Sequence, residues 1–84
     1  MDITIYTSTG CGYCSKIKEL MKRMDLDYTE QRLGVDFSRE DFQAMFPTES
    51  GFPRLVIDGE LIGGLTDAVK YFVDKGMLSS GMKK

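Results

Sequence analysis

Histidine and tryptophan are both absent from this 84-residue chain, and cysteine occurs only twice. Without histidine, catalytic sites of the Ser-His-Asp and Cys-His kinds and all imidazole metal ligands are excluded. Eleven basic residues against thirteen acidic ones give a net charge of −2. The chain has no excess of basic residues, so we do not expect it to bind nucleic acid or an anionic membrane. The apolar runs are also too short to span a bilayer, so we expect no membrane association.

The N-terminal segment Met1–Tyr6 lacks the basic residues and the long apolar stretch of a secretory signal, which favours a cytoplasmic protein. The two cysteines, Cys11 and Cys14, do not resemble a secreted disulfide scaffold, because a bridge between them would close almost no loop. A structural zinc site would need two carboxylates beside the two thiolates, which is an uncommon ligand set, so no metal is expected. The spacing C-x-x-C in a cytosolic chain instead indicates redox chemistry.

The chain length predicts one domain over residues 1–84, and hydrophobic spacing predicts elements in the order β-α-β-α-β-β-α. Strands are predicted where β-branched and aromatic residues cluster, and helices where apolar residues recur every three or four positions. A right-handed crossover between the first two strands and a later hairpin give a four-stranded mixed sheet with helices on both faces. The polar tail, residues 79–84, is expected to fray. The predicted strands cover residues 3–6, 26–33, 55–57 and 60–62, and the predicted helices open at Gly12, Ser38 and Thr66.

Turn and cap residues mark the ends of these predicted elements. Asp58 and Gly59 between two strands suit the type I′ turn of a hairpin. Ser38 and Asp41 resemble a capping box, and Thr66 is expected to cap the last helix. The residues expected to face inward from the last two helices are Phe42, Met45, Phe46, Val69, Phe72 and Val73.

Three motifs follow one another along the chain: Cys11–Cys14 after the first strand, Phe52–Gly59 at the hairpin, and Ile62–Asp67 before the last helix. In this order and spacing they resemble glutaredoxin over nearly the whole chain, from Ile3 to about Phe72. The resemblance implies the thioredoxin-like (glutaredoxin) fold of the α/β class, with a four-stranded mixed sheet and three helices.

The first motif has chemical consequences of its own. It places Cys11 at a helix N-terminus, where unpaired backbone N–H groups and the positive end of the helix dipole face the sulfur. Such sites lower the pKa of a cysteine from about 8.5 to roughly 3.5–7.5. Cys14 lies one turn further in, so we expect Cys11 to attack and Cys14 to resolve the mixed disulfide. The alternative is two buried cysteines without chemistry, but glycine on either side of Cys11 suits the close approach of another chain.

The resemblance also implies a glutathione-binding role for three residues near the cysteines. Pro53 matches a proline that is cis in the family and lies against the cysteine pair; by sequence alone, an edge-strand proline that starts the strand is favoured. The backbone of Phe52 is then placed to pair with an extended peptide. Tyr13 matches a ring that flanks the glutathione sulfur, and without the resemblance it is an ordinary exposed aromatic residue.

The last motif suits the γ-glutamyl end of glutathione. Backbone N–H groups at Thr66 favour a carboxylate, and the side chain of Asp67 favours the neighbouring ammonium group. The alternative is a simple helix start, in which Thr66 is the N-cap and Asp67 interacts with the helix dipole. The two interpretations are compatible.

Three positions depart from the family's usual pattern. Gly12 stands where many glutaredoxins have proline, and Gly51–Phe52 replaces a Thr-Val pair, which makes the groove bulkier but leaves the backbone pairing intact. Ser8 stands where many have a lysine that pairs with the glycyl carboxylate of glutathione. The candidate replacements for that lysine are Lys16, Arg39 and Arg54.

The resemblance implies an enzyme, a glutathione-dependent thiol–disulfide oxidoreductase with glutathione as co-substrate and no tightly bound cofactor. It implies a monomer that acts on disulfide or glutathionylated proteins, with ribonucleotide reductase among the family's acceptors. One alternative is a carrier of a [2Fe–2S] cluster held between two protomers, because some glutaredoxins with glycine after the first cysteine bind one. A second is a redoxin reduced by thioredoxin reductase, although the residues Gly63–Asp67 favour glutathione.

Overall fold

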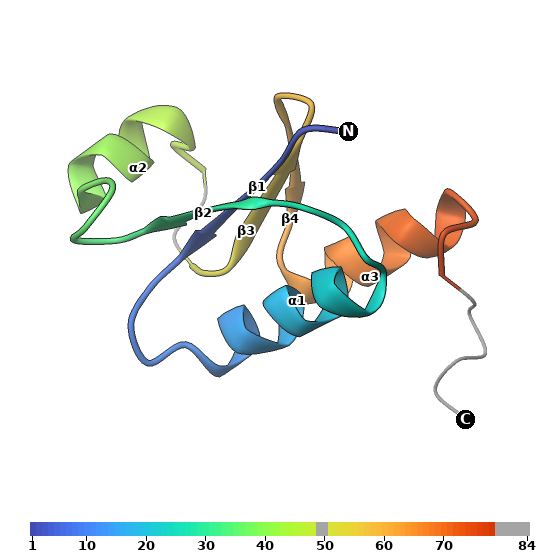
Figure 1. Cartoon of the computed structure of the whole chain (residues 1–84). Helices are drawn as coiled ribbons and strands as arrows, with labels where there is room; N and C mark the ends of the chain where they lie inside the picture. Colours follow the sequence, from blue (N-terminus) through green and yellow to red (C-terminus); the bar gives the residue numbers. More distant parts are fainter. Residues whose placement is uncertain (49–50, 79–84) are drawn as a thin grey trace.

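The computed structural model describes residues 1–48 and 51–78, and within them the elements follow the predicted order (Figure 1). The strands are β1 (Ile3–Thr7), β2 (Thr29–Arg32), β3 (Arg54–Ile57) and β4 (Glu60–Gly63), and the helices are α1 (Gly12–Arg23), α2 (Arg39–Met45) and α3 (Leu65–Asp74). The sheet has the order β2-β1-β3-β4, with β1 and β2 parallel and the other pairs antiparallel. The predicted mixed sheet is therefore confirmed, whereas the predicted fraying at 79–84 concerns residues outside the described ones.

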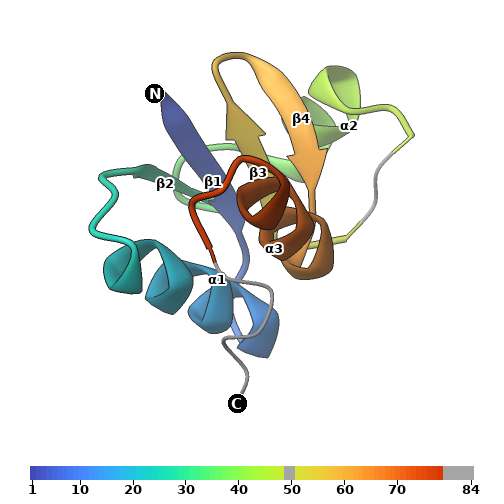
Figure 2. The same cartoon turned by 90° about the vertical axis from the view of Figure 1, so that its right-hand side faces the viewer.

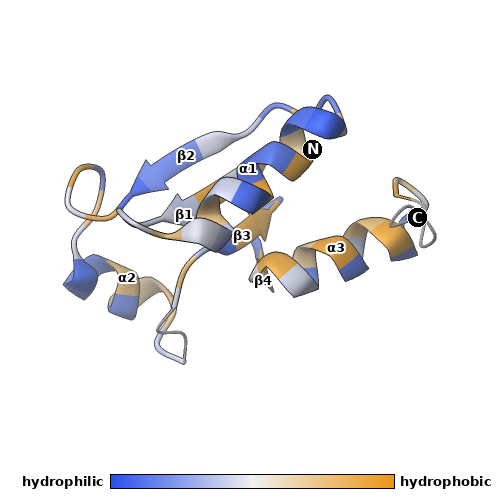
Figure 3. Ribbon diagram, turned by 90° about the horizontal axis from the view of Figure 1, so that it is seen from below, coloured by the Kyte–Doolittle hydropathy of each residue, from blue (hydrophilic) through white to orange (hydrophobic). Residues whose placement is uncertain are grey.

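One face of the sheet is covered by α1 and α3, which lie side by side in Figure 2. Side chains alternate between the two faces of a strand, so Ile3 and Ile5 of β1 both point toward these helices. Figure 3 shows apolar and polar residues alternating along both helices, whereas β2 is hydrophilic. The buried cluster between sheet and helices contains Ile3, Ile5, Ile17, Leu20, Met21, Leu55, Ile57, Ala68 and Phe72.

The opposite face carries α2, which is held by aromatic rings. The ring of Tyr6 lies 5.3 Å from that of Phe37 and 5.4 Å from that of Phe46, measured between centroids. The ring of Phe42 lies 4.7 Å from that of Phe52. Helices thus cover both faces, as predicted. Met45, predicted to face inward, is 45% exposed, but its Sδ lies 3.9 Å from Tyr6 Oη, so the side chain borders the aromatic cluster and is only partly covered by it.

The start of α3 differs from the prediction. Gly64, not Thr66, is the N-cap, and its backbone N–H donates to Oδ2 of Asp67 at 3.2 Å. The helix therefore begins at Leu65, before the hydroxyl that was expected to cap it. The buried positions of α3 are Ala68 and Phe72. Val69, predicted to face inward, is 37% exposed because it lies beside this buried stripe.

The other turn and cap predictions are confirmed. Ser38 Oγ accepts a hydrogen bond from Asp41 N at 3.0 Å, and Ser38 N donates to Asp41 Oδ2 at 3.2 Å, which completes the capping box. Asp58 and Gly59 have φ values of 52° and 84°, as a type I′ turn requires. Among the helices of the described residues, none has the length and apolar character needed to cross a bilayer.

Candidate active site

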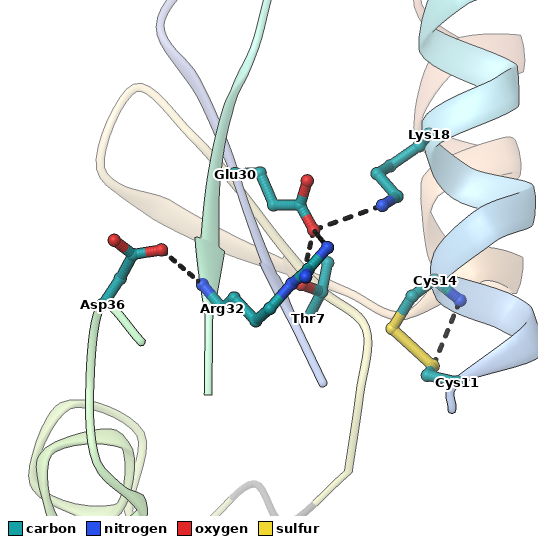
Figure 4. A network of polar contacts seen from close by, with 7 residues as sticks. All are labelled: Thr7, Cys11, Cys14, Lys18, Glu30, Arg32 and Asp36. Carbon is teal, nitrogen blue, oxygen red and sulfur yellow. Dashed lines mark hydrogen bonds and ion pairs between the residues drawn. A yellow bond between two sulfur atoms is a disulfide. The ribbon is translucent and has the colours of Figure 1, made fainter. Parts of the chain in front are cut away.

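The two cysteines form a disulfide at the start of α1. Cys11 is the N-cap of this helix, with extended backbone angles (φ −96°, ψ 108°), and its Sγ accepts a hydrogen bond from Cys14 N at 3.1 Å. The Cα atoms of the pair lie 5.2 Å apart. Figure 4 shows both sulfurs at the first turn of the helix. The sulfur of Cys11 is thus placed where the unpaired N–H groups of a helix start point.

Solvent access distinguishes the two sulfur-bearing residues. Cys11 is half-buried, whereas Cys14 is 2% exposed and belongs to the buried face of α1. An incoming thiol or disulfide therefore has access to Cys11 before it has access to Cys14. Access and the helix N-terminus favour the same order of attack, with Cys11 first.

A groove of about 240 Å³ meets the cysteine motif at Tyr13 and brings together four of the five predicted glutathione-binding residues. Tyr13 at its edge is 62% exposed, whereas Pro53 is buried. The Phe52–Pro53 peptide bond is cis, as the resemblance implied. The residues that line the groove are Tyr13, Phe52, Pro53, Arg54, Gly64, Leu65 and Thr66.

The fifth predicted residue, Asp67, lies in the first turn of α3 and does not line this groove. Its carboxylate is fixed by the hydrogen bond from Gly64 N to Oδ2. Gly63 has φ +131°, and a Cβ atom there would collide with the Asp67 side chain. Glycine at this position therefore allows the carboxylate to fold back against the β4–α3 turn, next to the groove.

A second hollow, of about 380 Å³, meets the cysteine motif at Cys11, Gly12 and Cys14. Ser8 lines it, as do three charged residues that the sequence analysis did not single out, namely Lys18, Glu30 and Arg32. We call this hollow the polar pocket. Glu30 and Arg32 belong to β2 and Lys18 to α1, so these side chains meet only through the parallel pairing of β1 with β2. No spacing in the sequence signals that meeting.

Glu30 is the centre of the charged groups in the polar pocket (Figure 4). Its Oε2 accepts a hydrogen bond from Thr7 Oγ1 at 2.8 Å and lies 3.2 Å from Lys18 Nζ and 3.5 Å from the Arg32 guanidinium. The Thr7 hydrogen bond and the two cations hold the pKa of Glu30 below its usual range, although partial burial acts in the opposite direction. Glu30 is therefore ionised near neutral pH, and the pocket holds two cations against one carboxylate.

Comparison with known proteins identifies the family. The Glutaredoxin family model matches residues 3–62. The chain belongs to the glutaredoxin family. It is 35% identical over 79 residues to glutaredoxin 1 of Rickettsia bellii, which covers 87% of this chain and 76% of that protein. It is also 36% identical over 70 residues to hybrid peroxiredoxin hyPrx5 of Haemophilus influenzae, and this match covers 83% of this chain but only 29% of the peroxiredoxin.

The solved structure of glutaredoxin 1 from Francisella tularensis, complexed with cacodylate, superposes with a TM-score of 0.73 at 28% identity. It covers 90% of this chain and 95% of that one. This similarity establishes the thioredoxin-like glutaredoxin fold. In a glutaredoxin, a close cysteine pair at a helix start indicates thiol–disulfide exchange.

The three candidate replacements for the lysine that this glutaredoxin lacks at residue 8 lie in different parts of the structure. Arg54 lines the groove, and Lys16 lines a small hollow with Val69 between α1 and α3. Arg39 is the first residue of α2. None of these three lines the polar pocket with Ser8, whereas Arg32 and Lys18 do. Among the described residues, no group of three or more acidic or cysteine side chains is arranged to hold a metal ion.

Proposed function

We propose that this glutaredoxin is a glutathione-dependent thiol–disulfide oxidoreductase that reduces protein disulfides and mixed disulfides with glutathione. One observation carries the proposal. The disulfide joins the half-buried Cys11 to the buried Cys14 at the start of α1, and Tyr13 between them lines a groove together with Pro53 and Thr66.

Reduction of a protein disulfide begins with the reduced enzyme. The Cys11 thiolate attacks one sulfur of the substrate, which forms a mixed disulfide and releases the other sulfur as a thiolate. Cys14 loses its proton and attacks Cys11 Sγ, so the second substrate thiolate leaves and the Cys11–Cys14 disulfide forms. Two glutathiones then reduce this disulfide and leave as glutathione disulfide.

A glutathionylated protein requires only Cys11. The thiolate attacks the glutathione sulfur and releases the protein thiolate, which leaves glutathione bonded to Cys11. A second glutathione thiolate attacks the bonded glutathione sulfur, which forms glutathione disulfide and restores the Cys11 thiolate. Cys14 is not consumed in this cycle.

The groove supports binding of the bonded glutathione. We expect the backbone of Phe52, which lines the groove next to Pro53, to pair with the extended peptide. At the start of α3 the backbone N–H groups favour the γ-glutamyl carboxylate. Asp67 next to the groove offers a charge for the γ-glutamyl ammonium, with its orientation fixed by Gly64 N.

We place this reaction in the cytoplasm, carried out by a monomer on disulfide or glutathionylated proteins such as ribonucleotide reductase.

The alternative function is that of an iron–sulfur carrier. A [2Fe–2S] cluster would need the Cys11 thiolate as a ligand, which is the same sulfur that forms the disulfide. The cluster and the disulfide therefore exclude each other at this residue. Protein purified anaerobically with glutathione is expected to be colourless. A brown protein would favour the function of a [2Fe–2S] cluster carrier.

A coupled assay tests the proposal. Hydroxyethyl disulfide is reduced in the presence of glutathione, glutathione reductase and NADPH, and a parallel assay replaces the first two with thioredoxin reductase. We expect turnover that depends on glutathione, and none above background with thioredoxin reductase alone. The opposite result would assign the protein to the redoxins that thioredoxin reductase serves.

A further inference from the structure

A tripeptide bonded through its sulfur to Cys11 has two ends to place. Glutathione carries a carboxylate at each end, and an extended tripeptide spans roughly 10 Å. If the γ-glutamyl end lies in the groove by Thr66, the glycyl end extends past Cys11. The polar pocket touches Cys11 and Gly12 and is lined by Ser8 and Arg32.

The pairing of β1 with β2 brings Arg32 close to Ser8. Arg32 is opposite Thr7 in the parallel register, one residue before Ser8, and Leu33 N donates to Thr7 O at 2.9 Å. A cation that is missing at residue 8 is therefore available from the neighbouring strand.

Arg32 is also the cation of the polar pocket that is most easily redirected. Its side chain is 49% exposed, and it lies 3.5 Å from Glu30 Oε2, farther than Thr7 Oγ1 or Lys18 Nζ from the same oxygen. An exposed ion pair at such a distance contributes little to stability. Glu30 keeps its bonds to Thr7 and Lys18 when Arg32 turns away, so the guanidinium is available to a second carboxylate.

We propose that Arg32 binds the glycyl carboxylate of glutathione, in place of the lysine that many glutaredoxins have at the position of Ser8. The inference rests on the proposed glutathione-dependent function and names the residue that recognises one end of that ligand. A guanidinium suits this task because its two N–H groups match the two oxygens of a carboxylate.

The test compares glutathione with its glycyl ethyl ester, in which that carboxylate is neutral. In the hydroxyethyl disulfide assay, Arg32→Gln is expected to raise the KM for glutathione roughly three- to tenfold and to leave kcat nearly unchanged. The KM for the ester should be the same for wild type and Arg32→Gln. Arg39→Gln, which removes an arginine that lines neither the groove nor the polar pocket, is the matched control and should change neither value.

A second variant restores a positive charge at residue 8, directly after β1. Ser8→Lys in the Arg32→Gln background should lower the KM for glutathione again and should have no effect on the KM for the ester. Thermal unfolding of each variant shows that the fold is intact.

Two results would overturn the inference. If Arg32→Gln leaves the KM for glutathione unchanged, or raises the KM for glutathione and ester equally, Arg32 does not bind the glycyl carboxylate. Failure of the proposed function looks different, because wild-type turnover would then show no dependence on glutathione.

Discussion

Replacing Asp67 separates two roles of one carboxylate. In the structure it accepts a hydrogen bond from Gly64 N at 3.2 Å in the first turn of α3, and in the proposed complex it also binds the γ-glutamyl ammonium. Asp67→Ala removes both interactions. Asp67→Asn retains an oxygen that can accept from Gly64 N but removes the charge. The two variants therefore have different expected effects on stability and a common effect on glutathione.

The magnitudes follow from these contacts. Loss of a capping interaction costs about 0.5–2 kcal/mol, and exposure of this side chain favours the lower end. For a domain of this size, about 1 kcal/mol corresponds to a shift of roughly 4–8 °C in Tm, so Asp67→Ala should lower Tm by a few degrees. A hydrogen bond to a charged group is worth about 1.5–3 kcal/mol, so the KM for glutathione should rise about tenfold in both variants.

The assay is steady-state reduction of hydroxyethyl disulfide over a range of glutathione concentrations, with thermal unfolding measured in parallel. Asp74→Asn is the matched control, because it makes the same change in net charge at the far end of α3. A KM for glutathione that stays unchanged in a folded Asp67→Asn protein would refute the reasoning. Glutathione would then not bind with its γ-glutamyl end at the start of α3.

Three further predictions concern the cysteines and the polar pocket. Cys11→Ser should abolish all thiol transfer, whereas Cys14→Ser should retain deglutathionylation and lose most reduction of protein disulfides; equal losses would contradict the assigned roles. In the reduced protein, the rate of Cys11 alkylation by iodoacetamide should rise with pH around a midpoint well below about 8.5, the pKa of a free thiol. A midpoint of about 8.5 would show that the helix start does not stabilise the Cys11 thiolate. Because the pKa of Glu30 is lower in the folded state than its ordinary value of 4.5, its ionisation stabilises the fold above that pH, and the contribution is lost as the pH falls through the folded-state pKa. Glu30→Gln should therefore lower the free energy of unfolding by up to about 1 kcal/mol at pH 7 and by less at pH 3, as measured by urea denaturation at both values; an equal loss at both would show that charge is not the cause.

The elements of the fold were predictable wherever one face of a helix or strand is buried. Ile3 and Ile5 alternate with Thr4 and Tyr6, which indicates a strand. The apolar residues of α1 recur at helical spacing, which indicates a helix with one buried face. Met45 and Val69 are more exposed than predicted, because an apolar residue at the edge of a buried stripe fits the same spacing. At the start of α3, a glycine N-cap supported by Asp67 replaced the expected Thr66, since the carboxylate reaches back to Gly64 N.

The candidate site was predictable where a motif is continuous in sequence and not where strands bring residues together. Cys11, Tyr13 and Cys14 are neighbours along the chain, so their chemistry is visible in the sequence. Glu30 and Arg32 lie on a hydrophilic strand whose polar residues gave only a weak strand signal. Their relation to Cys11 depends on the parallel register with β1, which local spacing does not encode.

The substitution of Gly51–Phe52 for the family's Thr-Val pair has a structural explanation in α2. The ring of Phe52 packs 4.7 Å from that of Phe42 and 6.0 Å from that of Phe37, so much of its added bulk is directed toward the aromatic cluster beneath that helix. The backbone of Phe52, which is proposed to pair with the substrate, is thus anchored from the opposite face of the sheet. The short helix α2 holds this anchor in place through its capping box and its rings. A helix that lines neither the groove nor the polar pocket therefore supports one edge of the groove, because Phe52 packs against it.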